Sequence, residues 1–236
     1  MKVVITGHLG FIGTHLRKHL EGQGIDIKEG NDILDCPLPP ADVVIHLAAQ
    51  AGVVESVNDP VGTITTNVTG TVRLLREYKD ARFIFASTGG AIQETIASPY
   101  GLSKYCAEEF IKLLHTNYVI LRFANVYGPN SRSVIDKFIN EDITIYGDGS
   151  ATRTYVHVDD LLRGIIDSIK WPVGSYYFGS NENYTVQELA EATGKPIRHT
   201  DWRPGELKHS SLKNTTPNWK PEINAINYIK TLCRVS

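Results

Sequence analysis

The chain begins with the sequence MKVVITGHLGFIG, residues 1–13, and this stretch decides the fold class. A β-branched run at residues 3–5 indicates a short buried strand, and glycines follow at positions 7, 10 and 13. Apolar side chains then recur at helical spacing as far as Leu20. A glycine-rich turn between a strand and an amphipathic helix is typical of a dinucleotide-binding loop. Residues 1–20 therefore predict the first βα unit of such a fold.

The three glycines of this loop have separate physical roles. Gly7 permits the tight turn out of the strand, Gly10 lets a pyrophosphate approach the backbone, and Gly13 lets the helix pack closely on the sheet. The helix N-terminus offers N–H groups and a positive dipole end to the phosphates. For His8, which lies inside the loop, contact with a phosphate oxygen and exposure to solvent are both open.

The region around the second predicted strand indicates which dinucleotide binds. Residues 25–28 are predicted as that strand, and residues 28–32 contain carboxylates but no arginine. A carboxylate at this place accepts hydrogen bonds from a free ribose 2′-hydroxyl, whereas a 2′-phosphate calls for arginine. NAD is therefore the predicted cofactor, and the residue that touches the ribose is left open.

Further along the chain, short β-branched runs alternate with stretches of helical period. Strands are predicted at 43–47, 83–85 and 118–123, and helices around 68–75 and 110–114. This alternation predicts an α/β fold with a Rossmann-type doubly wound parallel sheet. Beyond residue 129 the pattern is less regular and prolines are frequent, which predicts a small C-terminal substrate-binding lobe. The predicted NAD-binding domain covers residues 1–128, with 151–178 returning to it, and the lobe covers 129–150 and 179–236.

The composition argues against several classes of function. A net charge of −2 gives no reason to expect nucleic acid or an anionic membrane as a partner. The chain shows no secretory signal, and no apolar run approaches the roughly 18 residues of a membrane span. Three widely spaced cysteines suit a reducing compartment and form no metal-binding pattern, so we expect a cytoplasmic protein without a metal. Asp159 and Asp160, close to His157, are interpreted as helix caps.

Tyr100 and Lys104 lie four residues apart at the start of a predicted helix, so their side chains share one face. A phenol with an ordinary pKa of about 10 is a poor base at neutral pH, but a nearby ammonium group and a positive nicotinamide favour the phenolate. Such a pair can arise by chance on a helix surface. Its position after the glycine loop and after the strand that ends at Thr88 favours a catalytic pair, in which the Thr88 hydroxyl orients a substrate oxygen. Ser87 is equally compatible with capping its own turn.

Several longer motifs accompany this pair. They are His46–Ala49, Asn67-Val68, Pro99–Lys104, Arg122–Pro129, Tyr146–Gly149 with Arg153, Tyr155–Asp160 and Arg203–Glu206. In their order and spacing they resemble the extended short-chain dehydrogenase/reductases and, within them, the NAD-dependent nucleotide-sugar epimerase/dehydratase group. The resemblance covers almost the whole chain.

The resemblance implies roles for individual residues. Tyr100 is the implied catalytic acid and base, Lys104 binds the nicotinamide ribose, and Thr88 is the hydroxyl of the triad. Substrate binding is implied for Thr88, Asn125, Tyr146, Arg153 and Arg203, with the two arginines on a diphosphate. The implied cofactor contacts, the glycine loop included, are Gly7, Gly10, Phe11, Ile12, Gly13, Asp32, Ile33, Leu47, Ala48, Ala49, Asn67, Ala86, Ser87, Tyr100, Lys104 and Phe123.

Three regions are shorter here than is usual in the family. The residues after Thr88 also bear on which reaction the protein catalyses. The trimmed regions are the connection after the second strand, residues 93–98 and residues 130–142. These deletions leave the cofactor site intact and affect the specificity for the sugar. A 4,6-dehydratase typically carries an Asp-Glu pair after the triad hydroxyl, whereas Gly89–Ala91 follow Thr88 here.

We therefore expect a UDP-glucose/UDP-galactose 4-epimerase or a close relative, which oxidises C4 transiently and returns the hydride to the other face. A nucleotide-sugar reductase or a dehydratase of the same family is an alternative. A non-catalytic dinucleotide-binding protein is a further one. The resemblance also implies a homodimer formed through helices around residues 61–78 and 100–114.

Overall fold

The computed structural model describes residues 1–93, 96–180, 182–202 and 209–233. The chain divides into two compact units, each with its own core. The first unit comprises Met1–Arg122 and Ile165–Tyr176, and the second comprises Phe123–Gly164 and Tyr177–Ser236.

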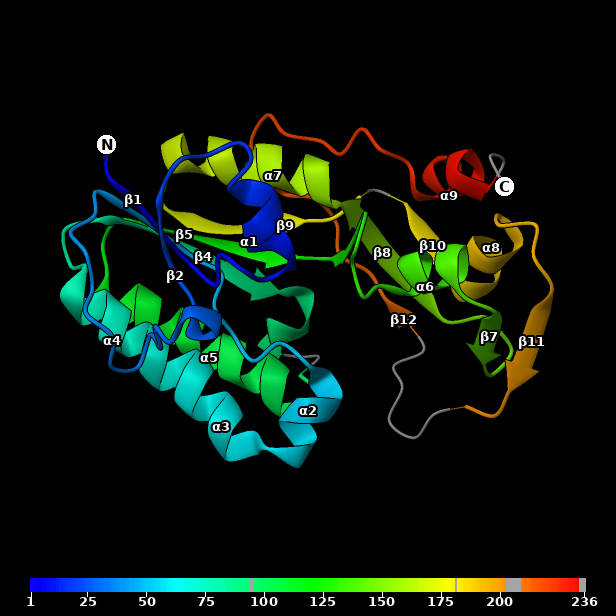
Figure 1. Ribbon diagram of the computed structural model, residues 1–236, viewed down its shortest axis with the longest axis horizontal. Coiled ribbons are helices and arrows are strands. Elements are labelled where there is room, and N and C mark those ends of the chain that lie inside the picture. The colour runs from blue at the N-terminus through cyan, green and yellow to red at the C-terminus, as the bar shows by residue number, and fades with distance from the viewer. Residues whose placement is uncertain (94–95, 181, 203–208, 234–236) are drawn as a thin grey trace. The chain divides into compact units, whose positions relative to one another are not determined.

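A six-stranded sheet forms the centre of the first unit, in the order β2-β1-β3-β4-β5-β9 (Figure 1). β1 runs parallel to both β2 and β3, and β3 runs parallel to β4. The strand order reverses between β1 and β3, and ligands of such sheets bind beyond the carboxyl ends of the strands at this point. The predicted α/β fold with a parallel sheet is confirmed. The strands are β1 (Val3–Thr6), β2 (Gln23–Ile25), β3 (Val43–His46), β4 (Arg82–Thr88), β5 (Tyr118–Phe123) and β9 (Gly174–Phe178).

Helices cover both faces of this sheet, with α1 on one face and α4 and α5 on the other (Figure 1). The start of α5 is well specified by its sequence, because the Ser98 side chain accepts a hydrogen bond from Gly101 N and Pro99 occupies the first turn. Among the described residues, no helix is both long and apolar enough to cross a membrane. The helices are α1 (Phe11–Leu16), α2 (Val53–Asn58), α3 (Pro60–Ile64), a π-helical turn (Thr65–Thr69), α4 (Gly70–Glu77) and α5 (Pro99–Leu114).

The second strand differs from the sequence-based expectation. It was expected at residues 25–28, whereas β2 ends at Ile25 and a 3-10 turn follows at Ile27–Glu29. Asp26 causes this early end, because its carboxylate accepts a hydrogen bond from Lys28 N and caps the turn. Gly30 completes the turn in the left-handed conformation, with φ of 77°.

The second unit is built from short strands and helices around its own apolar cluster, which includes Tyr127, Phe138 and Leu189. β10, β8 and β12 form one sheet, with β6 also pairing with β8, and β11 pairs with β7. The elements are β6 (Asn125–Tyr127), α6 (Val134–Asn140), β7 (Ile143–Tyr146), β8 (Thr152–His157), α7 (Val158–Asp167), β10 (Asn183–Thr185), α8 (Val186–Glu191), β11 (Ile197–Thr200), β12 (His209–Ser210) and α9 (Ala225–Cys233).

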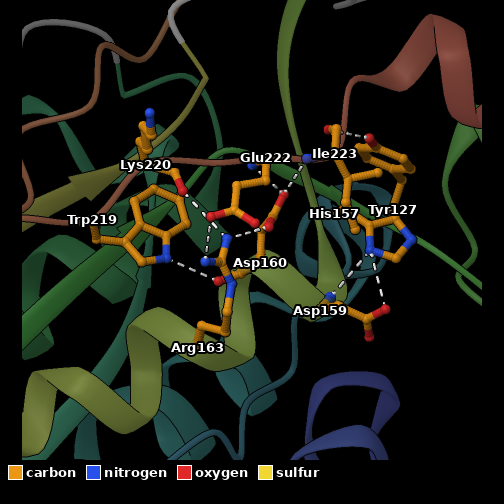
Figure 2. Close-up of polar contacts among 9 residues, drawn as sticks. All are labelled: Tyr127, His157, Asp159, Asp160, Arg163, Trp219, Lys220, Glu222 and Ile223. Carbon is orange, nitrogen blue, oxygen red and sulfur yellow. Dashed lines mark hydrogen bonds and ion pairs between the residues drawn. The ribbon is translucent and has the colours of Figure 1, made fainter.

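Asp160 anchors the segment before α9 to α7, as Figure 2 shows. Its carboxylate, in a side chain that is 2% exposed, accepts hydrogen bonds from the backbone N–H groups of Glu222 at 3.0 Å and Ile223 at 2.8 Å. Arg163 donates to the same carboxylate at 2.5 Å and to Glu222 at 2.9 Å. The interpretation of Asp160 as a helix cap is therefore wrong, since the backbone N–H groups that its carboxylate accepts from lie more than sixty residues away in sequence.

Candidate active site

The glycine loop connects β1 to α1 with no room for side chains at two of its positions. Gly7 has a φ of +70°, and a Cβ built on it would lie 2.6 Å from Ala48 N. A Cβ on Gly13 would lie 2.4 Å from the Gly7 carbonyl oxygen. Gly10 precedes the first residue of α1, and no side chain caps that helix. This backbone-lined cradle fits the pyrophosphate of a dinucleotide.

Asp26 is a candidate cofactor residue that the sequence reasoning missed. It follows β2 directly, is 7% exposed, and accepts hydrogen bonds from Leu9 N at 2.9 Å and Lys28 N at 3.0 Å. In Rossmann folds, the carboxylate that binds the ribose hydroxyls lies at this place, about 20 residues after the glycine loop. The sequence predicts the second strand as far as Lys28, which places Asp26 inside that strand. A carboxylate at the end of the strand was therefore not recognised.

His8 lies inside the protein rather than in solvent. Its side chain is 2% exposed, and its ring fills the space beside Gly24, where a Cβ would come within 2.5 Å of ring atoms. His8 Nε2 lies 3.4 Å from a Glu29 carboxylate oxygen, and Lys28 Nζ donates to the Leu9 carbonyl at 2.9 Å. The option of an exposed His8 is therefore wrong. Residues 26–29 hold the loop from the side of β2.

His46, at the end of β3, bridges two hydroxyl groups in the core. Its Nδ1 lies 2.7 Å from Thr6 Oγ1, and its Nε2 lies 2.9 Å from Thr71 Oγ1. Thr71 donates its proton to the Asn67 carbonyl, so it accepts from His46 Nε2–H. Ala48 N in turn donates to Thr6. Burial, and secondly the nearby Lys104 charge, hold the pKa of His46 well below its ordinary value, so the ring is neutral. With its one proton on Nε2, its Nδ1 accepts from Thr6 Oγ1.

Asn67 connects this network to α5. Its side chain is 1% exposed, its Oδ1 accepts from Gln50 N at 2.9 Å, and its Nδ2 donates to Gln50 O at 3.1 Å and Ser103 Oγ at 2.9 Å. Ser103 Oγ donates to the Tyr100 carbonyl at 2.8 Å. Both the loop after β3 and the first turn of α5 are thus held by one buried amide.

The structure brings Thr88, Tyr100 and Lys104 together. Thr88 ends β4, Tyr100 lies in the first turn of α5, and their side chains are hydrogen-bonded. One turn further along α5, Lys104 Nζ donates to the Ala86 carbonyl at 2.9 Å and lies 4.4 Å from the centre of the Phe85 ring. Tyr100 and Lys104 lie on one helix, as their spacing predicted, and their catalytic roles stay a prediction.

Burial shifts the pKa values of both catalytic candidates away from the charged forms. It raises the pKa of Tyr100 to about 12, against the opposing effect of the Thr88 hydrogen bond. It lowers the pKa of Lys104 to about 7, against the opposing charge of Glu108. A buried ammonium group close to its pKa at neutral pH needs support from its neighbours to remain charged.

The other proposed cofactor residues of the first unit lie around the carboxyl ends of β1, β3 and β4. Phe11, Ile12 and residues 47–49 are half-buried, and Ser87 donates to Glu108 at 2.5 Å. Ile33 is 4% exposed and packs in the apolar core, and its carbonyl accepts from Arg73 at 2.6 Å. Asp32 accepts from Leu34 N at 3.0 Å and starts the turn that carries Ile33.

The remaining proposed residues belong to the second unit. Asn125 is exposed and donates to the Thr154 carbonyl at 3.0 Å, while Arg153 donates to the Thr152 carbonyl at 2.8 Å. Tyr146 is half-buried at the end of β7. Phe123 packs edge-on against the Phe178 ring at 5.8 Å. Arg203 lies outside the described residues.

Comparison with protein families gives one match, over residues 31–175, to the NAD dependent epimerase/dehydratase family. The chain is 32% identical over 292 aligned residues to a putative UDP-glucose 4-epimerase of Methanocaldococcus jannaschii, covering 97% of this chain and 96% of the relative. It is 27% identical to UDP-glucuronic acid decarboxylase 1 of Arabidopsis thaliana, covering 95% of this chain and 67% of the relative. An alignment of 292 positions for a chain of 236 residues means that the archaeal relative carries segments with no counterpart here.

Two solved structures show the same fold. UDP-glucose 4-epimerase from Thermotoga maritima, solved with UDP-glucose, is 28% identical with a TM-score of 0.84, covering 99% of this chain and 98% of that chain. UDP-glucose 4-epimerase from Thermus thermophilus, solved with NAD, is 27% identical with a TM-score of 0.82 and the same coverage.

Proposed function

Because the chain belongs to the NAD-dependent epimerase/dehydratase family, we propose that it is a nucleotide-sugar 4-epimerase acting on UDP-glucose and UDP-galactose or a close relative. The family match confirms the resemblance inferred from the motifs, and NAD is the cofactor of this family. The observation that carries the proposal is the hydrogen-bonded pair of Thr88 and Tyr100, with Lys104 one turn along the same helix.

The first unit supplies the groups proposed to hold NAD. The glycine loop offers bare backbone to the pyrophosphate, and Asp26, placed at the end of β2, is proposed to bind the adenosine ribose. Lys104 is proposed to bind the nicotinamide ribose. When bound, NAD supplies a hydride acceptor and a positive charge on its nicotinamide ring. Asn125, Tyr146, Arg153 and Arg203 are proposed for the nucleotide and its diphosphate, where guanidinium groups suit the oxygen geometry.

Tyr100 is the proposed acid and base. Its Oη takes the proton of the sugar 4-hydroxyl and later returns it, while Thr88 orients the sugar oxygen. Burial raises the pKa of Tyr100 to about 12, so the phenol needs nearby positive charge before it can act as a base at neutral pH. Lys104 is the cationic side chain proposed to provide it.

Residues 89–91 favour epimerisation over dehydration. They form a 3-10 turn, Gly89–Ala91, in which Gly90 N donates to Thr88 Oγ1 at 3.2 Å. Elimination of water across C5 and C6 needs an additional acid and base, and these three positions carry no ionisable side chain.

The test is incubation of the purified protein with UDP-galactose and a catalytic amount of NAD, followed by NMR of the products. We expect UDP-glucose to form without net change in the cofactor. In a parallel incubation with an equimolar amount of NADH, its stoichiometric oxidation would instead indicate a reductase. A 4-keto-6-deoxy product would indicate a dehydratase. UDP-glucuronic acid is tested as a second sugar in the same assay, because a decarboxylase would release carbon dioxide from it. No conversion of any of these sugars would contradict the proposal.

We also propose that the protein forms a homodimer through α2, α3 and α5. These helices carry apolar side chains on the surface, including Val54 at 69%, Val61 at 74% and Leu113 at 79% exposed. Six further exposed apolar residues lie on the same helices, Val53, Val57, Ile64, Leu102, Phe110 and Leu114. An apolar surface of this kind on neighbouring helices suits a second copy of the same helices. Size-exclusion chromatography with light scattering measures the mass, and a monomer at all concentrations would contradict the proposal.

A further inference from the structure

A buried ion pair lies beside Lys104 in the first unit, with Glu108 one turn further along α5. The Glu108 carboxylate is 0% exposed and accepts hydrogen bonds from Arg122 Nε at 2.9 and 3.1 Å, from Arg122 Nη2 at 2.5 Å and from Ser87 Oγ at 2.5 Å. Arg122 is 9% and Ser87 3% exposed. Burying two charges is costly, and apolar residues of similar volume often stabilise a core as well or better. The pair therefore calls for a reason other than packing.

The position of Ser87 shows what this ion pair fixes. Ser87 lies between Ala86, whose carbonyl accepts from Lys104 Nζ, and Thr88, whose side chain is bonded to Tyr100. Its own hydroxyl is bonded to Glu108, which lies four residues after Lys104 on α5. Three consecutive residues of β4 are thus each bonded to a different position of α5. Glu108 sets the register between the strand and the helix.

The charges around Lys104 show a second effect of Glu108. Glu108 faces Lys104 from its own helix and His46 faces it from β3, while Arg122 on β5 is held by Glu108 itself. His46 is neutral, because burial and then the Lys104 charge hold its pKa well below its ordinary value. Among these groups Glu108 opposes the effect of burial on Lys104, because its negative charge raises the pKa of the ammonium group.

We propose that Glu108, held by Arg122 and Ser87, is a positioning residue that keeps Lys104 charged and holds β4 in register with α5. The inference deepens the proposed function, since the charge on Lys104 serves the Tyr100 chemistry proposed above. Glu108 itself is buried and acts through Lys104.

Direct titration of Lys104 tests this without any substrate. Full-length protein carrying 13C-labelled lysine is titrated by NMR in the absence of NAD, and the Lys104 signal is identified by its loss in Lys104→Arg. We expect Glu108→Gln to lower the titration midpoint of Lys104 by on the order of one pH unit, as the loss of a nearby opposite charge does. The matched control is Glu109→Gln, because Glu109 is the next residue on α5 and pairs at the surface with Lys112 at 2.6 Å. We expect no shift from the control.

Glu108→Gln leaves Arg122 buried without its partner and can destabilise the fold. If it fails to fold, Glu108→Gln with Arg122→Met removes both charges at similar volume, and the midpoint of Lys104 is still expected below that of the unaltered protein. An unchanged midpoint in the folded variant overturns the inference. A shifted midpoint in a protein that converts no nucleotide sugar supports the inference and contradicts the proposed function. With an active enzyme, Glu108→Gln should also move the basic limb of the kcat profile to lower pH, because Lys104 loses its proton earlier.

Discussion

The neutral state of His46 makes the stability of the protein depend on pH below neutrality. Burial, and secondly the charge of Lys104, hold the pKa of His46 well below 6.5, its ordinary value and the value expected in the unfolded chain. Below that pH the unfolded chain binds a proton that the folded protein does not. The stability from His46 is therefore complete above its unfolded pKa and decreases as the pH falls.

The size of this effect follows from one proton. Stability decreases by up to about 1.4 kcal/mol per pH unit, so at about pH 5.5 the loss from His46 is about 1.4 kcal/mol relative to neutral pH. His46→Gln removes the buried ring and with it this contribution. At neutral pH the same variant is less stable by about 1–3 kcal/mol, because the Thr6 and Thr71 hydroxyls lose well-placed partners.

Urea unfolding across this pH range gives both quantities. We expect the free energy of unfolding of the unaltered protein to decrease more steeply between neutral pH and about pH 5.5 than that of His46→Gln. The control is His19→Gln, an exposed histidine in the turn after α1, which should keep the steep slope. Parallel curves for the unaltered protein and His46→Gln would refute the reasoning. A proton found on Nδ1 instead of Nε2 by 15N NMR would refute the hydrogen-bond assignment.

Three further predictions concern the reaction, the second unit and the assembly. Tyr100→Phe should lower kcat at least about 100-fold while NAD still binds, as fluorescence titration would show; near-normal turnover contradicts the role of Tyr100. Asp160→Asn should destabilise the protein by about 3 kcal/mol and expose the amides of residues 222–223 to hydrogen exchange. The exposed Asp159→Asn is its control, and equal effects would contradict the anchoring role. Val61→Glu should convert the proposed dimer to a monomer, measured by light scattering, and an unchanged mass excludes α3 from the interface.

The glycine loop could be predicted from the sequence because its requirements are local. The close approach of Gly13 to the Gly7 carbonyl depends on residues six apart, and the strand before them and the helix after them are read from neighbouring side chains. The same holds for Tyr100 and Lys104, whose common face follows from the period of one helix. The parallel sheet follows from the alternation of strands and helices.

The residues whose roles the sequence did not predict fall into two groups. Some have partners that are distant in sequence, and one, Asp26, could be recognised only by knowing where β2 ends. Asp26 was hidden because the residues after Ile25 have strand-like character, and only a hydrogen bond to Lys28 N shows the turn. Glu108 and Arg122 are fourteen residues apart on different elements. Asp160 reaches partners sixty-two and sixty-three residues away. No local pattern contains such pairs, because tertiary packing alone creates them.

The ionisable groups of the first unit's core influence one another, and this coupling gives a last prediction. Glu108 favours the charged form of Lys104, and charged Lys104 lowers the pKa of His46, so that His46 stays neutral and keeps the tautomer that orders Thr71 and Asn67. Lys104→Met removes the middle charge. The pKa of His46 should then rise toward its ordinary value, although burial still holds it low. The titration midpoint of His46, followed by NMR of its ring nitrogens, should therefore be higher in Lys104→Met than in the unaltered protein. An equal midpoint in both proteins would mean that burial alone keeps His46 neutral and that the two sites are not coupled.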